Sequence, residues 1–273
     1  MAYDYEKSIR PGKLPHIWCP GCGHGIVMKG LIRAMDSCGL EKNNTALVSG
    51  IGCASRLPGY VDMCTLHTAH GRAAAFATGV KMAKPEMTVI CLGGDGDGTA
   101  IGGNHFIHAC RRNIDMTYVI MNNFIYGMTG GQFSPCTPTG MKASTTPYGN
   151  PDPTFDISKL AIGAGATFVA RTTAFHATQI DKLIAEGIKH KGMAVIEVLD
   201  DCPTTYGRRN KFRSVVDMMK KLKENAVPVQ AASKMTAEQL QGKFLTGVLY
   251  KEDKPEYIEQ YAKVIAKAQG QAS

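Results

Sequence analysis

Five short apolar runs, rich in β-branched residues, recur along the chain, and the stretches between them have helical spacing. The runs cover residues 45–50, 88–94, 117–123, 167–172 and 194–200. Apolar positions three and four residues apart over 26–35 and 180–188 predict amphipathic helices. Strands that are apolar almost throughout, alternating with helices, are typical of a parallel sheet covered on both faces. The pattern therefore predicts an α/β fold with a doubly wound parallel sheet.

Two segments depart from this alternation. Residues 125–155 are rich in Gly, Pro, Ser and Thr and are predicted to form a long loop, which in a compact domain is usually functional. After about residue 203 the pattern changes to charged helices. We therefore expect an α/β domain over 1–202 and a helical C-terminal extension over 203–273 that packs on the domain or on a partner subunit.

Composition narrows the class of protein. Of the 273 residues, 44% are hydrophobic, which allows a substantial core and argues against disorder. No run of about 18 apolar residues occurs, so we expect no membrane span. The first residues lack the apolar segment of a signal peptide. Together with nine cysteines, these features predict a cytoplasmic protein whose thiols are free or bound to metal.

The net charge says less about which partners the protein binds. The net charge is +8, and much of the excess lies between residues 208 and 223. A basic face can attract nucleic acid or an acidic protein, or it can be an ordinary solvated surface. We find no zinc-finger spacing, RNA-binding motif or alternation of aromatic and basic residues, so we expect no nucleic-acid partner.

The most informative stretch is residues 88–132, which reads as strand, glycine turn, helix, strand and polar loop. Asp95 ends the first strand and Asn123 ends the second, as in one βαβ unit. A right-handed crossover places such strands side by side, so both side chains can emerge at one carboxyl edge. A carboxylate and an amide oxygen suit Mg²⁺, which often shares its ligands with phosphate. Gly94 and Gly96 would let the backbone approach those phosphates.

Other motifs for phosphate or calcium fail at this stretch. A dinucleotide fingerprint from Gly94 needs glycine where Thr99 stands, and an EF-hand loop from Asp95 needs glycine at Ala100. The P-loop pattern GxxxxGK[ST] does not occur. A lone GDG is more often a simple turn. Here GDG is followed by 25 residues and NN, on two strand ends, which favours a diphosphate and Mg²⁺ site.

Four cysteines are placed where they could act together. Cys19 and Cys22 form a CxxC pair in a loop, and Cys53 and Cys202 follow the first and last strands. Four thiolates can hold Zn²⁺ or a [4Fe–4S] cluster. Structural zinc usually shows two CxxC pairs, whereas a thioredoxin-like dithiol would need only the first two cysteines. The cysteines alone leave the cluster, zinc and free buried thiols as equal alternatives.

The spacing GDG-x25-NN resembles the motif of thiamine diphosphate enzymes. The resemblance implies that the side chains of Asp95 and Asn123 and the backbone carbonyl of Ile125 bind Mg²⁺, and that the loop 126–132 wraps the diphosphate. The cofactor-binding residues implied in this way are Gly52, Cys53, His70, Gly94, Asp95, Gly96, Asn123, Ile125, Gly127, Met128 and Thr129.

The chain as a whole resembles the beta subunit of 2-oxoacid:ferredoxin oxidoreductases, and is most similar to the 2-oxoglutarate enzyme. The segments that carry the resemblance are CPGCGHG, SGIGCASR, HTAHGRAAAFATGVK, GDGDGTAIGGNH, NNFIYGMTGGQ and DDCPTTYGRRNK. It implies a thiamine-diphosphate-binding (PP) domain whose Cys19, Cys22, Cys53 and Cys202 hold a [4Fe–4S] cluster. Decarboxylation of a 2-oxo acid would then release electrons to this cluster and on to ferredoxin, with coenzyme A taking the acyl group. Pyruvate and branched-chain 2-oxo acids are alternative substrates.

Two further side chains are candidates for contact with reacting groups. By resemblance, His70 approaches the cofactor, and the simpler alternative is a helix-capping histidine. Arg56 could pair with a substrate carboxylate through two hydrogen bonds, and an ordinary surface arginine is equally compatible with its position.

A partner chain is expected from what the sequence lacks. Thiamine enzymes need a glutamate beside the aminopyrimidine ring, and a second α/β domain supplies it. One chain of 273 residues has no room for both domains, which predicts an alpha subunit as partner rather than a homodimer. Two other readings stay open: a thiamine-dependent decarboxylase or synthase without a redox cluster, and a non-catalytic protein stabilised by zinc.

Overall fold

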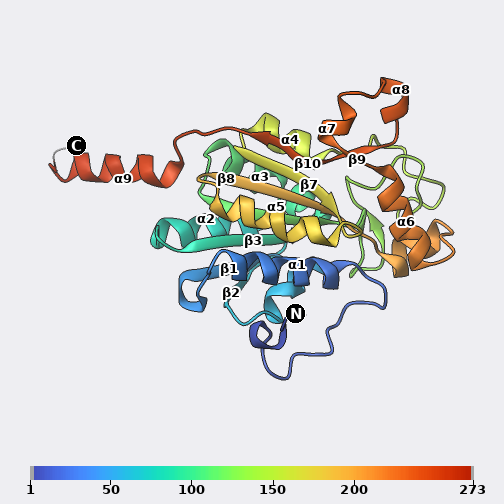
Figure 1. The fold of residues 1–273 in the computed structure, drawn as a ribbon, viewed down its shortest axis with the longest axis horizontal. Coiled ribbons are helices and arrows are strands. Elements are labelled where there is room, and N and C mark those ends of the chain that lie inside the picture. Colours follow the sequence, from blue (N-terminus) through green and yellow to red (C-terminus); the bar gives the residue numbers. More distant parts are fainter. Residues whose placement is uncertain (1–2, 272–273) are drawn as a thin grey trace.

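The computed structural model describes residues 3–271 and shows an eight-stranded sheet between two layers of helices (Figure 1). Five parallel strands form its buried centre. They are β1 (Thr45–Ser49), β3 (Thr88–Gly94), β4 (Met116–Asn122), β8 (Met193–Leu199) and β7 (Phe168–Thr173), in spatial order. Each lies within one residue of its predicted limits. The predicted doubly wound α/β fold is therefore confirmed.

Helices cover both faces of this sheet because alternate strand residues point in opposite directions. The helices on one face are α1 (His24–Ser37) and α5 (Ala177–Lys189). Those on the other are α2 (Ala73–Ala83), α3 (Gly103–Arg111) and α4 (Ile157–Ala164). Ile90 packs into the first core and its neighbour Cys91 into the second, and both are fully buried. The two cores hold the strands, and hence their ends, in fixed positions.

The C-terminal part adds strands as well as helices. β10 (Phe244–Lys251) runs antiparallel to β7, and β9 (Ala226–Pro228) pairs with β10. The helices are α6 (Val215–Asn225), α7 (Val229–Ala232), α8 (Ala237–Leu240) and α9 (Tyr257–Ala268). The sequence predicted helices here but neither strand. β10 is partly exposed and is interrupted by Gly247, so it lacks the apolar run of a central strand.

The carboxyl ends of four parallel strands meet at one edge. Gly94 of β3 lies opposite Met121 of β4, and Asn122 lies opposite Leu199 of β8. On the other side, Ser49 of β1 pairs with Leu92. Four short elements follow these ends. They are η3 (Ala54–Gly59), η4 (Gly96–Ile101), η5 (Pro203–Gly207) and the hairpin of β5 (Ile125–Tyr126) and β6 (Gln132–Phe133).

The remaining elements lie at the periphery. β2 (Cys64–His67) forms the sheet edge beside β1, and η1 (Glu6–Ser8) and η2 (Lys42–Asn44) are single turns. Among residues 3–271, no helix combines the length and the apolar character that a membrane crossing requires. The division of the chain at residue 202 stays a prediction, although β10 lies in the same sheet as the strands before it.

Candidate functional site

A small cavity of about 60 Å³ lies at the carboxyl edge of the sheet. All eleven residues that the sequence suggested for cofactor binding line it, together with His24, Ile51, Ala54, Asp97, Met121 and Tyr126. They come from loops that follow β1, β2, β3 and β4 and from the start of α1. The topology therefore brings these distant segments together, while their individual roles stay predictions.

Asp95 is a buried carboxylate that forms no ion pair with the described residues. It follows β3 directly, is 2% exposed, and makes no ion pair within residues 3–271. Burial raises its pKa to about 7, although the Ser134 hydroxyl, which donates to Oδ2, opposes the rise. A buried carboxylate is costly unless it is paired or binds a metal. A cation in the cavity would remove that cost.

The Asn123 amide is a second free group in the cavity wall. Its side chain is 5% exposed and makes no hydrogen bond to any described residue. The next residue, Phe124, has a φ of 65°, which non-glycine residues seldom adopt. Hydrogen bonds hold it there: its N–H donates to Asn122 Oδ1 at 3.1 Å, and Thr137 Oγ1 donates to its carbonyl at 2.5 Å. Such strain is often found at binding sites.

The donors at this site fit a hard cation. Asp95, Asn123 and the backbone of Ile125 all line the cavity and offer carboxylate, amide and carbonyl oxygens. In the described part of the chain, no three His, Cys, Asp or Glu side chains are gathered as a ready metal site. One acidic ligand with neutral oxygens is the kind of site at which Mg²⁺ keeps waters or phosphate oxygens as its other ligands.

Tyr126 lines one side of the cavity, and its position explains why residue 96 is a glycine. The Tyr126 hydroxyl donates to the Gly96 carbonyl at 3.0 Å, and a side chain at position 96 would collide with the Tyr126 ring. Gly96 begins η4, a turn of π-helix, and π-turns often mark functional sites. The glycine that we predicted for approach to phosphate thus also makes room for an aromatic wall.

The four candidate cysteines lie around the same edge. Cys53 lines the cavity, and its sulfur and that of Cys202 lie within 3.6 Å of the point where a Gly127 side chain would begin. Burial raises the pKa of the Cys53 thiol, and the nearby Cys22, Cys202 and Cys19 raise it further. Cys19 is exposed and Cys202 is buried. Cys19, Cys22 and Cys202 therefore lie near Cys53, but among residues 3–271 no three of these side chains are gathered as a ready metal site, and their role as cluster ligands stays a prediction.

Backbone contacts fix the loop that carries Cys19 and Cys22. The N–H of Cys22 donates to the Cys19 carbonyl at 3.0 Å, which makes a tight turn. Gly21 has a φ of 83°, and a side chain there would collide with Val215. The Trp18 indole donates to the Cys53 carbonyl at 2.7 Å, which joins this loop to the one after β1.

His24 is a site residue that the sequence reasoning missed. It is 1% exposed and lines the cavity, with Nδ1 bound to Asp200 and with Nε2 buried and unpaired among the described residues. Burial would lower its pKa, but the Asp200 carboxylate holds the pKa well above its usual value. Asp200 comes just after β8, and His24 begins α1. The signal was in the sequence, because His24 lies within the CPGCGHG segment.

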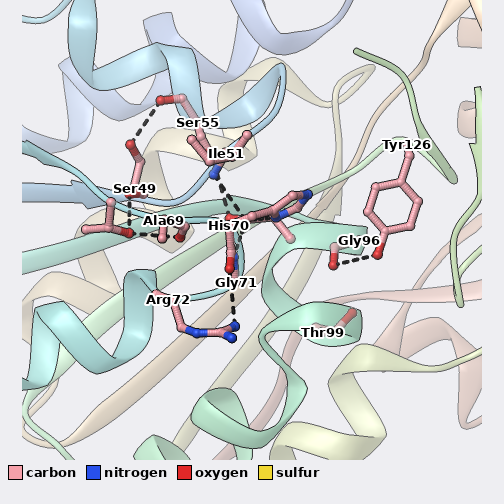
Figure 2. A network of polar contacts seen from close by, with 12 residues as sticks. Ser49, Ile51, Ser55, Ala69, His70, Gly71, Arg72, Gly96, Thr99 and Tyr126 are labelled. Atoms are coloured by element: carbon pink, nitrogen blue, oxygen red, sulfur yellow. Dashed lines mark hydrogen bonds and ion pairs between the residues drawn. The ribbon is translucent and has the colours of Figure 1, made fainter. Parts of the chain in front are cut away.

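His70 and Arg56 have different placements. His70 lines the cavity, and its ring lies near that of Tyr126, with 6.0 Å between centroids (Figure 2). Its Nδ1 lies 2.6 Å from Oδ1 of Asp97, a buried carboxylate that the sequence reasoning also missed. Arg56 lies on η3, is exposed, and is not among the residues that line the cavity. The contact of Arg56 with a substrate stays a prediction.

Comparison with known proteins agrees with this geometry. Residues 50–198 match the family described as thiamine pyrophosphate enzyme, C-terminal TPP binding domain. A 2-oxoglutarate synthase subunit KorB from Methanocaldococcus jannaschii is 52% identical over 96% of this chain and 97% of its own length. A 2-oxoacid:ferredoxin oxidoreductase subunit beta from Saccharolobus solfataricus is 43% identical over 68% of this chain and 62% of its own.

A solved structure extends the likeness to the whole fold. The 2-oxoglutarate:ferredoxin oxidoreductase from Magnetococcus marinus, with 2-oxoglutarate, coenzyme A and succinyl-CoA bound, superimposes with a TM-score of 0.87 at 37% identity. The match covers 99% of this chain and 92% of that chain. The chain belongs to the thiamine-pyrophosphate-binding enzymes and, within them, to the beta subunits of 2-oxoglutarate and other 2-oxoacid:ferredoxin oxidoreductases.

Proposed function

We propose that this beta subunit binds the diphosphate of thiamine diphosphate with Mg²⁺, holds a [4Fe–4S] cluster, and takes part in the oxidative decarboxylation of 2-oxoglutarate. The observation that carries the proposal is the position of Cys53. It lines the cavity with Asp95 and Asn123, and the thiols of Cys22, Cys202 and Cys19 are near enough to affect its pKa. A cofactor that releases electrons and a cluster that accepts them would then be neighbours.

The proposed reaction converts 2-oxoglutarate and coenzyme A into succinyl-CoA, CO₂, one proton and two electrons. Bound thiamine diphosphate supplies the carbon nucleophile and the electron sink that such a decarboxylation needs. In this chain, Asp95, Asn123 and the Ile125 carbonyl would hold Mg²⁺ against the diphosphate. The backbone of 127–129 would wrap the diphosphate, and the four cysteines would hold the cluster that passes the electrons singly to ferredoxin.

The size of the cavity supports a partner. About 60 Å³ is far below the roughly 300–1,000 Å³ of sites that enclose a whole cofactor. We propose that this chain binds only the diphosphate and its metal, and that a second surface covers the rest of the cofactor. We propose an alpha subunit, which would also supply the glutamate for the aminopyrimidine ring.

The choice of 2-oxoglutarate as the proposed substrate rests on the names and bound ligands of similar proteins. The Methanocaldococcus relative is named for 2-oxoglutarate, and the Magnetococcus structure holds 2-oxoglutarate and succinyl-CoA. The Saccharolobus relative is named only for 2-oxo acids, which favours a broader specificity as the second candidate. That candidate uses the same chemistry on pyruvate or branched-chain 2-oxo acids.

The test is an anaerobic assay of the chain purified with its partner subunit. We expect reduction of ferredoxin, or of a viologen dye, that requires both 2-oxoglutarate and coenzyme A, with pyruvate far slower. Comparable rates with pyruvate would support the broader candidate. Decarboxylation without electron transfer would instead indicate a non-redox thiamine enzyme.

A further inference from the structure

Asp97 lies where three loops meet. Its Oδ1 accepts the backbone N–H of Ile51 at 3.1 Å and of Gly71 at 2.7 Å, and it lies 2.6 Å from His70 Nδ1. These three partners are labelled in Figure 2. These partners follow β1 and β2, whereas Asp97 itself follows β3. The side chain is 3% exposed. The glycine at position 50 leaves room for Asp97, because a side chain there would collide with the Asp97 carboxylate.

This arrangement sets the direction of the His70 ring. The ring nitrogen next to the backbone, Nδ1, is taken up by Asp97, and a carboxylate acceptor requires a proton there. The other nitrogen, Nε2, has no hydrogen bond to any described residue, and the side chain is 28% exposed in the cavity wall. Nε2 is therefore the atom of this ring that a ligand can reach. The Tyr126 ring lies beside the His70 ring, with 6.0 Å between centroids (Figure 2).

We propose that Asp97 is a positioning residue. It accepts a hydrogen bond from Nδ1–H of His70, which fixes the ring and presents Nε2 to an oxygen of the diphosphate. An anionic oxygen accepts a hydrogen bond, so Nε2 donates. The identity of the ligand rests on the proposed function, whereas the orientation of the ring does not. In other enzymes, too, a buried aspartate orients a histidine by accepting a hydrogen bond from its Nδ1–H.

A purely structural role would give the same contacts but different mutant behaviour. If Asp97 only ties the three loops together, its removal should weaken binding whether or not His70 is present. If it acts through His70, its removal should have no further effect once His70 is gone. A double-mutant cycle separates these cases.

The experiment uses the full chain and has two measurements. The first is the ¹⁵N NMR signal of the His70 ring, assigned by comparison with His70→Ala. We expect Nδ1 to carry a proton in the wild type and in Asp97→Asn, whose amide oxygen can accept the same three N–H groups. In Asp97→Ala we expect this fixed state to be lost. Asp152→Ala, at an exposed carboxylate, is the matched control and should leave the signal unchanged.

The second measurement is calorimetric binding of thiamine diphosphate, and of pyrophosphate, in the presence of Mg²⁺. We expect His70→Ala and Asp97→Ala each to weaken binding about tenfold, as for one lost hydrogen bond to a charged group, and the double variant to be no weaker than either. If Asp97→Ala does not fold, Asp97→Asn takes its place. Its smaller loss, about threefold, should vanish in the His70→Ala background.

Two results would overturn the proposal: multiplicative losses in the cycle, or a fixed Nδ1 proton in Asp97→Ala. A wild-type chain that binds neither phosphate ligand, with or without its partner subunit, would contradict the proposed function instead. In that event the NMR comparison still decides whether Asp97 orients the ring.

Discussion

Two aspartates of the segment GDGD, only two residues apart, have opposite surroundings. Asp97 accepts hydrogen bonds from two backbone N–H groups and contacts a histidine, whereas Asp95 accepts one from the Ser134 hydroxyl and makes no ion pair within residues 3–271. The first is satisfied by the protein itself. The Asp95 carboxylate is left free to bind a cation in the cavity. This contrast is why we assign the metal to Asp95.

Replacing Asp95 tests that assignment. Asp95→Asn keeps the shape but removes the charge that attracts Mg²⁺, so we expect Mg²⁺-dependent retention of thiamine diphosphate to fall by at least about 100-fold, with iron content unchanged. Bound cofactor and iron are counted after gel filtration, and Asp152→Asn serves as the exposed control. Loss of iron with cofactor binding intact would mean that we have confused the two sites.

Replacing Cys202 tests the cluster. Cys202→Ala removes one of four proposed ligands, so iron per chain and visible absorbance should both decrease. Cys64→Ala, at an exposed cysteine on β2, should change neither. An unchanged spectrum in the Cys202 variant would remove this residue from the ligand set.

The residues that the sequence reasoning found and missed differ in one respect. Asp95 and Asn123 follow predicted strands, so topology alone places them together. Asp97 and His24 contact partners up to 176 residues away, Asp200 being the most distant, and although His24 lies in the CPGCGHG segment, no local pattern shows which residue it pairs with. Arg56 shows the reverse case, because a charged residue near a strand end can still face solvent.

The strands also differ in how well the sequence predicts them. The central strands were predictable because burial on both faces requires nearly continuous apolar sequence. β2 has one partner strand and is largely exposed, and β10 joins the sheet through antiparallel pairing from a charged region. β2 lies at one edge of the sheet, and only the three-residue β9 lies beyond β10 at the other. Strands at or next to a sheet edge need little apolar surface, and so the pattern does not reveal them.

A buried ion pair joins α2 to the segment before β4, and it gives a pH-dependent prediction. Lys81 Nζ lies 2.8 Å from Asp115 Oδ2, and both side chains are largely buried. Burial alone would raise the pKa of Asp115, but Lys81 lowers it below its ordinary value. The pair therefore stabilises the fold above pH of about 4, where unfolded aspartate is ionised, and the stabilisation is lost as pH falls through the lower folded pKa.

Lys81→Met should lower the free energy of unfolding at pH 7 by about 2 kcal/mol, because Asp115 then keeps only the Gly192 N–H and the exposed Lys191, 3.6 Å away. The acid-side pH dependence contributed by this pair should shrink as well. Urea denaturation at several pH values measures both effects. Lys84→Met, which removes a long surface pair with Glu86, is the control and should change stability by less than about 0.5 kcal/mol. Equal losses in the two variants would contradict a buried pair.

At the scale of the whole molecule, the small cavity predicts how affinity is divided between subunits. The isolated chain should bind Mg²⁺–pyrophosphate and thiamine diphosphate with similar affinity, because it contacts only the diphosphate. With the alpha subunit, thiamine diphosphate should bind at least about 100-fold more tightly than pyrophosphate, since the rest of the cofactor is then enclosed. A strong preference for the whole cofactor in the isolated chain would show that no partner surface is needed.

The central claim is that one edge of the sheet holds both the diphosphate of the cofactor and the cysteines of a cluster that accepts electrons from the reaction. The most direct measurement is electron paramagnetic resonance of the anaerobically purified complex, with iron counted in the same sample. We predict about four iron atoms for each copy of this chain, and a reduced-cluster signal that forms on addition of 2-oxoglutarate and is lost in Cys202→Ala. A colourless protein with zinc and no iron, or a cluster that 2-oxoglutarate cannot reduce, would contradict the account.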